Sequence, residues 1–257
     1  INYLKAKEFK KAEDLYNEII SEKPDYDEAW LHALSKEVNI MFDVGCHWGK
    51  SALIATSSPL LGKIFLIDPN PLSLSKAAEN LIMNDVISKA TLISKAAYKV
   101  SGESIKLWTM PGAFSGASID KKFTESGSIT GNYFSVETIT LDELAKNYNI
   151  IPDVIKIDVE GAEVSVLLGA VDIAHQQKTT FLIEVHSCEG LTIEDNTTRI
   201  LNWCTENKYH AHYLSQHERL TETDNIKHRG RFHVLLLPEN KKYPENLKLI
   251  KQGDPLD

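Results

Sequence analysis

Short apolar runs recur along the chain, and segments of helical length separate them. The runs are apolar in their interiors, which is typical of strands buried on both faces of a sheet. The predicted strands are Asn39–Val44, Lys63–Asp68, Ala90–Ala97, Asp153–Glu160, Thr179–His186, Ala211–Leu214 and Arg231–Leu237. The predicted helices are His47–Thr56, Leu72–Met83, Leu141–Tyr148, Ala162–Ala170 and Asn196–Asn207. This alternation predicts an α/β fold with a mostly parallel, doubly wound sheet.

One segment interrupts the alternation. Ser101–Ser135 is rich in glycine and serine and contains one strand-like stretch, Ile105–Met110. Long connections of this kind commonly carry binding residues. We predict an insertion near the functional site, built as a hairpin and a loop.

The N-terminal part of the chain has a helical pattern. Its apolar residues recur at a period near 3.6 up to Pro24, and a second helix follows. The spacing of Ala12, Tyr16, Pro24 and Trp30 resembles one incomplete tetratricopeptide repeat. We therefore predict a short N-terminal helical hairpin before the α/β domain.

The predicted boundary divides the chain into a helical segment, residues 1–37, and one α/β domain, residues 38–257. A single repeat cannot bury its own apolar face. The helical segment is therefore expected either to pack on the α/β domain or to end a longer array, where it would bind a protein partner or another copy of the chain. A plain helical hairpin that caps the domain is the other interpretation.

Charge and composition exclude several classes of protein. The 257 residues carry a net charge of −8 with histidine counted neutral, which argues against nucleic acid or an anionic membrane as the main partner. No apolar run is long enough to span a membrane, and the charged N-terminus does not resemble a signal peptide. Three scattered cysteines cannot form a disulfide framework, which favours a cytoplasmic location.

The candidate chemistry begins at Asn39–Gly49, whose sequence NIMFDVGCHWG predicts a strand, a glycine turn and a helix. Glycine lets a backbone approach a ligand closely, and a helix N-terminus favours anionic groups. The second predicted strand ends at Asp68, 23 positions after Gly45. An acid at that place in an α/β fold commonly binds ribose hydroxyls. We therefore predict a cofactor that contains a nucleoside.

The glycine spacing excludes two common nucleotide motifs. Counted from Gly45, the dinucleotide fingerprint would need glycine at His47 and Lys50, and no P-loop motif is present. What remains is D-x-G-x-x-x-G, formed by Asp43, Gly45 and Gly49. This pattern is similar to the first motif of class I S-adenosylmethionine-dependent methyltransferases. An ordinary strand–helix turn with two glycines is the alternative.

Several further motifs resemble the FkbM-type family of S-adenosylmethionine-dependent methyltransferases. The resemblance covers residues 38–238, and KIDVEGAE is its most distinctive part. It implies a seven-stranded Rossmann-like sheet with a reversed last strand. It also implies methyl transfer from S-adenosylmethionine, usually to a hydroxyl of a sugar, glycan or secondary metabolite. The matching motifs are Asp43–Gly45, Asp68–Pro71, Leu141–Leu144, Lys156–Glu163 and Glu184–His186.

The same resemblance implies which residues contact the cofactor. The implied contacts are Asp43, Gly45 and Gly49 at the methionine end, with Cys46 in the same turn, Asp68 at the ribose, followed by Pro69, Ala96 and Ala97 at the adenine, and Asp158 and Glu160 near the transferred methyl group. The chain departs from the family at Cys46, His47 and Trp48, where small residues are usual. Asp68 stands where the family often has glutamate.

Transfer of a methyl group to a hydroxyl requires alignment of the acceptor and benefits from a general base. His186 ends a strand at the predicted crevice, and the ordinary pKa of histidine suits proton removal. We assign proton removal to His186 and electrostatics to Asp158, with Glu160 as the second candidate for the base. A structural histidine and helix-capping acids are the alternatives. No ligand spacing fixes a metal site, so no metal is predicted.

Two other functions fit parts of the sequence. An NAD(P)-dependent oxidoreductase uses a similar sheet, although its glycine fingerprint is absent here. A non-catalytic protein-binding module would make the N-terminal helical segment the functional part. Titration with each cofactor, followed by a test of turnover, distinguishes these functions from methyl transfer.

Overall fold

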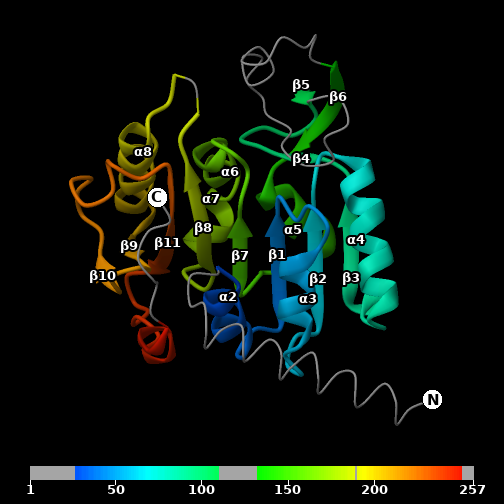
Figure 1. The fold of residues 1–257 in the computed structure, drawn as a ribbon, viewed down its shortest axis with the longest axis horizontal. Coiled ribbons are helices and arrows are strands. Elements are labelled where there is room, and N and C mark those ends of the chain that lie inside the picture. Colours follow the sequence, from blue (N-terminus) through cyan, green and yellow to red (C-terminus); the bar gives the residue numbers. More distant parts are fainter. Residues whose placement is uncertain (1–26, 110–131, 189, 251–257) are drawn as a thin grey trace.

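The computed structural model describes residues 27–109, 132–188 and 190–250. In these parts the chain forms a large sheet, a small sheet and helices that pack around the large one (Figure 1). Most of the predicted N-terminal hairpin, including the tetratricopeptide-like positions Ala12, Tyr16 and Pro24, lies outside the described residues. No helix in the described ranges has both the length and the apolar character that crossing a membrane requires.

Eight strands form the large sheet. Their order across the sheet is β10 (Glu218–Arg219), β9 (Tyr209–Tyr213), β11 (Arg231–Pro238), β8 (Thr180–His186), β7 (Val154–Ile157), β1 (Ile40–Val44), β2 (Lys63–Ile67) and β3 (Ala90–Ile93). The five strands from β8 to β3 are parallel, and β11 runs antiparallel to both β8 and β9. The α/β class, the mostly parallel sheet and the reversed late strand are thus confirmed.

The predicted number of seven strands is wrong, because β10 adds an eighth. This strand has two residues, both exposed, and pairs with His212 and Tyr213 of β9. It contains no apolar run, since it buries no side chain. A strand of this kind leaves no hydrophobic pattern by which the sequence could reveal it.

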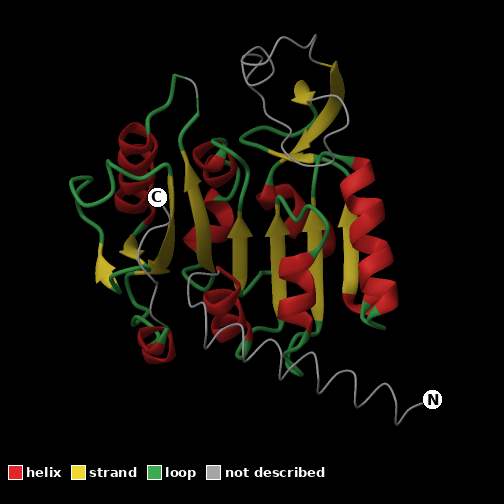
Figure 2. Ribbon diagram, in the orientation of Figure 1, coloured by secondary structure: helices red, strands yellow, loops and turns green. Residues whose placement is uncertain are grey.

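Helices cover both faces of the large sheet (Figure 2). Phe42 and Val44 of β1 face one apolar core, whereas Met41 faces the other, so β1 is buried on both sides. The helices of the first core are α5 (Leu141–Tyr148), α6 (Glu163–Leu168), α7 (Val171–His175) and α8 (Ile193–Asn207). The helices of the second core are α2 (Asp27–Ser35), α3 (Lys50–Thr56), α4 (Pro71–Met83) and the 3₁₀ helix η3 (Glu245–Leu249). A further 3₁₀ turn, η1 (Ile87–Lys89), leads into β3.

The small sheet lies beyond the carboxyl ends of the parallel strands (Figure 1). Its strands are β4 (Ala96–Ala97), β6 (Asn132–Ile139) and β5 (Ser104–Thr109), in that order. The antiparallel pairing of β5 with β6 confirms the predicted hairpin, although β6 itself was not predicted. The predicted strand over 90–97 is wrong as one element, because the chain leaves the large sheet after β3 and joins the small sheet at β4.

Helix α2 belongs to the core of the α/β domain. The Trp30 ring is fully buried, and its centroid lies 5.3 Å from that of His233 in β11. Leu31 joins the same apolar core as Met41 and Ile64. Helix α2 therefore packs on the α/β domain, which was one of the two arrangements expected for the helical segment. The domain boundary between residues 37 and 38 stays a prediction.

Candidate functional site

The candidate residues gather at one edge of the large sheet. Asp43 lies in β1, Asp68 follows β2, Asp158 follows β7 and His186 ends β8. These four strands are parallel neighbours, so their carboxyl ends meet. Open α/β sheets bind ligands at this edge.

The glycine turn after β1 has three residues with positive φ. They are Gly45 at 78°, His47 at 47° and Gly49 at 77°. A Cβ atom at Gly45 would lie 1.8 Å from the carbonyl oxygen of Asp158. The close approach at Gly45 is therefore to the end of β7, so the protein's own packing requires this glycine.

Asp68 holds the glycine turn to the start of α4. Its Oδ2 accepts a hydrogen bond from the His47 backbone N–H at 2.9 Å, and its Oδ1 accepts one from the Asn70 N–H at 2.8 Å. Burial raises the pKa of Asp68 to about 6, against the lowering effect of these two bonds. Each carboxylate oxygen keeps a further lone pair, so the side chain can still accept hydroxyl hydrogen bonds.

Asp43 is the least satisfied polar group of the site. It is completely buried in β1, and among the described residues neither carboxylate oxygen has a hydrogen-bond partner. Burial raises its pKa to about 6, although the charge of Lys156 opposes the shift. A buried carboxylate without donors is costly, so this position suits a ligand that brings its own N–H donors.

The other predicted cofactor contacts lie in the glycine turn, after β2 and in β4. Cys46 is buried in the glycine turn, and burial raises the pKa of its thiol well above the ordinary value. Ala96 and Ala97 form β4 and pair with β6. A cavity of about 560 Å³ lies beside Asp68. Its lining residues are Pro69, Asn70, Pro71, Leu72, Ser94, Phe134, Ser135, Val136 and Glu137. Pro69 thus lines the cavity, and Ser94 does so in place of the predicted alanines.

His186 is held by a buried acid that comes from a different element. Its Nδ1 lies 3.0 Å from Oε1 of Glu163, the first residue of α6. Glu163 is 0% exposed, and its Oε2 accepts a hydrogen bond from Asn196 Nδ2 at 2.8 Å. Burial lowers the pKa of His186, but the hydrogen bond to Glu163 and the charges of Glu160, Glu163 and Glu184 outweigh it and raise the pKa to about 9. The imidazole is therefore protonated at neutral pH.

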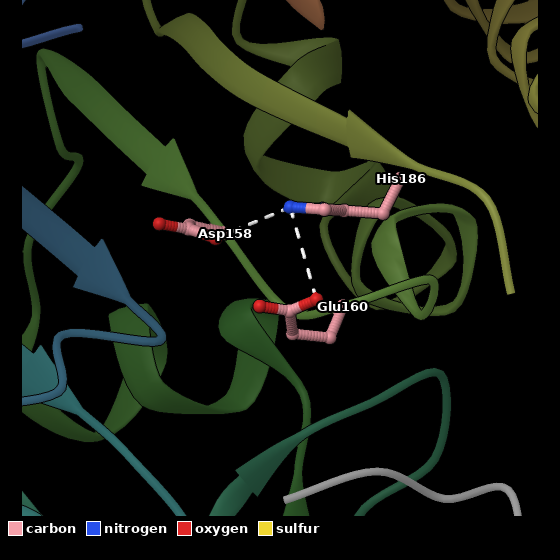
Figure 3. A group of neighbouring side chains, drawn as sticks. All are labelled: Asp158, Glu160 and His186. Atoms are coloured by element: carbon pink, nitrogen blue, oxygen red, sulfur yellow. Dashed lines mark ion pairs between the residues drawn. The ribbon is translucent and has the colours of Figure 1, made fainter. Parts of the chain in front are cut away.

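Asp158 and Glu160 face the other side of the same imidazole (Figure 3). His186 Nε2 lies 3.9 Å from Asp158 Oδ1 and 3.9 Å from Glu160 Oε2. The second oxygen of Asp158, Oδ2, accepts a hydrogen bond from Lys156 Nζ at 2.9 Å. Glu160 adopts a left-handed φ of 52° in the turn after β7, a conformation that is costly for most residues other than glycine, asparagine and aspartate.

The sequence did not reveal the buried glutamates that hold His186 and its neighbours in place. Glu163 fits a helix-capping role, and its Oε1 does accept a hydrogen bond from the Gly161 N–H at 2.9 Å. Its contacts with His186 and Asn196 join segments far apart in the chain, and no local pattern signals them. Glu184 is likewise buried, and its Oε1 lies 3.1 Å from Nη1 of Arg231 on the neighbouring strand.

Known proteins resemble this chain over much of its length. One curated relative is the hexuronic acid methyltransferase AglP of Haloferax volcanii, which is 28% identical over 154 residues. The match covers 60% of this chain, and the chain spans only 58% of the relative's length.

Solved structures of methyltransferases also match. Methyltransferase FkbM from Methylobacillus flagellatus KT gives a TM-score of 0.48 at 16% identity, over 78% of this chain and 43% of that one. The O-methyltransferase from Bacillus cereus in complex with SAH gives a TM-score of 0.49 at 10% identity, over 82% of this chain and 81% of that one. The family model of the methyltransferase FkbM domain matches residues 43–211, which is more than half of the chain. The chain therefore belongs to the FkbM family of methyltransferases.

Proposed function

We propose that the chain is an S-adenosylmethionine-dependent methyltransferase that methylates a hydroxyl of a sugar, a glycan or a similar small molecule. Membership of the FkbM family supports methyl transfer. The name of the relative AglP, a hexuronic acid methyltransferase, supports a sugar acid as the acceptor. The observation that carries the proposal is the buried, unpartnered carboxylate of Asp43 at the carboxyl edge of the sheet.

The residues at this edge fit the cofactor. Asp43 accepts hydrogen bonds from the ammonium group of the methionine end, which relieves the cost of its burial. Asp68 uses its remaining lone pairs to accept the ribose hydroxyls. Gly45, Cys46 and Gly49 shape the turn between these two acids. When bound, S-adenosylmethionine supplies a methyl group that its sulfonium makes electrophilic.

The cavity beside Asp68 suits the adenine. Its apolar walls come from Pro69, Phe134 and Val136, and Ser94 adds a polar group. Ala96 and Ala97, proposed from the family resemblance to border the adenine, lie just past Ser94 in the sequence and pair with β6. In this proposal the hairpin of β5 and β6 closes over the nucleoside.

Asp158, Glu160 and His186 face the acceptor. The carboxylate of Asp158 stabilises positive charge in the crevice and stays fixed by its bond to Lys156. His186 was the first candidate for the base, but its raised pKa leaves it protonated at neutral pH, so it positions the acceptor by donating a hydrogen bond. Glu160, whose side chain is 56% exposed, takes the hydroxyl proton and exchanges it with water.

Isotopically labelled S-adenosylmethionine tests this function. The protein is incubated with the labelled cofactor and a panel of hexuronic acids and neutral hexoses, and the products are analysed by mass spectrometry. The expected result is one labelled methyl group on a hydroxyl oxygen. Label on a nitrogen or on the carboxyl group of the acceptor would contradict O-methylation. Tight cofactor binding without transfer to any acceptor would favour the protein-binding alternative.

A further inference from the structure

We propose that Asp158, Glu160 and His186 form a binding site for one first-row divalent metal ion. Each residue offers one ligand atom, and the three atoms lie within 4.8 Å of one another. Figure 3 shows the two carboxyl groups converging on the ring nitrogen of His186. The imidazole suits ions such as Fe²⁺ and Zn²⁺, and the two carboxylates also suit Mn²⁺.

The direction of the Nε2 atom of His186 is the first observation that points to a ligand. The side chain of His186 is 8% exposed. Its Nε2 points into the group, yet the carboxylate oxygens around it lie beyond hydrogen-bonding distance. The nearest is Glu184 Oε1 at 3.6 Å, and those of Asp158 and Glu160 are both at 3.9 Å. The nitrogen therefore faces two carboxylates across 3.9 Å without a direct hydrogen bond to either, as a metal ligand would.

The contacts on the other side of the ring are the second observation. The Nδ1 of His186 donates to Glu163, which is itself fixed by Asn196 and by the Gly161 N–H. Metal-binding histidines commonly donate their second ring N–H to a carboxylate, which fixes the ring and makes the coordinating nitrogen more basic. Glu163 therefore fixes the ring with Nε2 directed at Asp158 and Glu160, and a metal ion would displace the proton from Nε2.

The charges of the group match a divalent ion. When the imidazole is neutral, the carboxylates around it exceed the nearby cationic side chains by two charges. The carboxylates counted are Asp158, Glu160, Glu163 and Glu184, and the cations are Lys156 and Arg231. A cation bound among these carboxylates would offset this negative charge.

Only a small adjustment would complete the coordination. With bonds of about 2.0–2.2 Å, neighbouring ligand atoms lie about 3–3.5 Å apart around the ion. The two separations of 3.9 Å at His186 Nε2 must therefore shorten by about 1 Å or less, and the ligand atoms of the whole group, which now lie within 4.8 Å of one another, must all come to this spacing. Glu160 can make this movement because its side chain is on the surface, whereas Asp158 is held in place by Lys156. Positions of the ion that the protein leaves open face the crevice.

Electron paramagnetic resonance of Mn²⁺ tests the site without cofactor or acceptor. The full chain, freed of metal with a chelator, is titrated with Mn²⁺ at neutral pH. We expect one bound ion per chain and a nitrogen coupling from the imidazole in the pulsed spectrum. Because no methyl transfer is measured, failure of this experiment would leave the proposed reaction unaffected, whereas a bound ion would replace the hydrogen bond and the proton removal assigned above to His186 and Glu160.

Matched variants define the ligands. Glu160→Gln should weaken Mn²⁺ binding tenfold or more, whereas Glu79→Gln should bind as the original chain does. The two glutamate side chains are almost equally exposed, at 56% and 57%, but Glu79 pairs with Lys76 on α4. His186→Gln should abolish the nitrogen coupling.

Two results would overturn the site. One is the absence of stoichiometric Mn²⁺ binding to the original chain. The other is equal Mn²⁺ affinity in Glu160→Gln and Glu79→Gln. If His186→Gln does not fold, the nitrogen coupling of the original chain still decides whether an imidazole binds the ion.

Discussion

Replacing Gly45 by alanine tests the close packing of the glycine turn against the backbone at the end of β7. Gly45 has a φ of 78°, and an added Cβ would lie 1.8 Å from the carbonyl oxygen of Asp158 and 2.8 Å from its carbonyl carbon. Real Cβ atoms do not approach other heavy atoms within 3.0 Å, so β1 and the end of β7 must separate by about 1.2 Å. This movement would displace Asp158.

The expected cost has two parts. The left-handed conformation costs an L-residue about 1–2 kcal/mol. Forcing an extra carbon into a packed region costs about 1–3 kcal/mol. Together they predict a loss of about 2–5 kcal/mol in the free energy of unfolding for Gly45→Ala.

Gly102 provides the matched control for this variant. Its φ is 79°, and an added Cβ would meet no atom within 4 Å. Gly102→Ala should therefore lose only the conformational part, about 1–2 kcal/mol. Urea denaturation of both variants measures the difference. Equal losses would refute the close packing of Gly45 against β7.

Three further predictions concern stability and cofactor affinity. Trp30→Ala should lower the free energy of unfolding by about 3–5 kcal/mol, because the ring is fully buried beside His233. A loss below about 1 kcal/mol in urea denaturation would contradict the packing of α2 against the core. The pKa of Asp68 is about 6, and its ionised form is the better hydrogen-bond acceptor. Calorimetry should therefore show the affinity for S-adenosylmethionine falling as the pH drops through 6. Constant affinity from pH 5 to 8 would contradict the binding of the ribose hydroxyls by Asp68. Asn196→Ala removes the hydrogen bond to Glu163 and should cost about 1–3 kcal/mol of stability with cofactor affinity unchanged; a selective loss of affinity would place Asn196 in the cofactor site.

Local signals allowed much of the fold to be predicted from the sequence. The helix predicted over Leu141–Tyr148 has those bounds in the structure. Thr140 caps its first turn by accepting a hydrogen bond from the Glu143 N–H, and Asn149 ends it in the left-handed conformation. Both residues are typical of these positions, so the sequence alone defines the ends. The apolar runs located the parallel strands for the same local reason.

Long-range contacts could not be predicted in this way. The glycine at position 45 suggested a close approach to a ligand, but the atom nearest to an added Cβ belongs to the backbone of Asp158. The pKa of His186 is raised through Glu163 and Glu184, which come from different elements, so the residue type alone suggested a neutral base.

Calorimetric titration of S-adenosylmethionine into the original chain and into Asp43→Asn tests most directly whether this edge of the sheet is the cofactor site. The substitution keeps the size of the side chain but removes the charge that accepts the ammonium hydrogen bonds, which are worth about 1.5–3 kcal/mol. The predicted result is saturable binding to the original chain and affinity about tenfold or more weaker in Asp43→Asn, with the variant at least as stable to urea. Absence of binding to the original chain, or equal affinity in the two proteins, would contradict the proposed cofactor site.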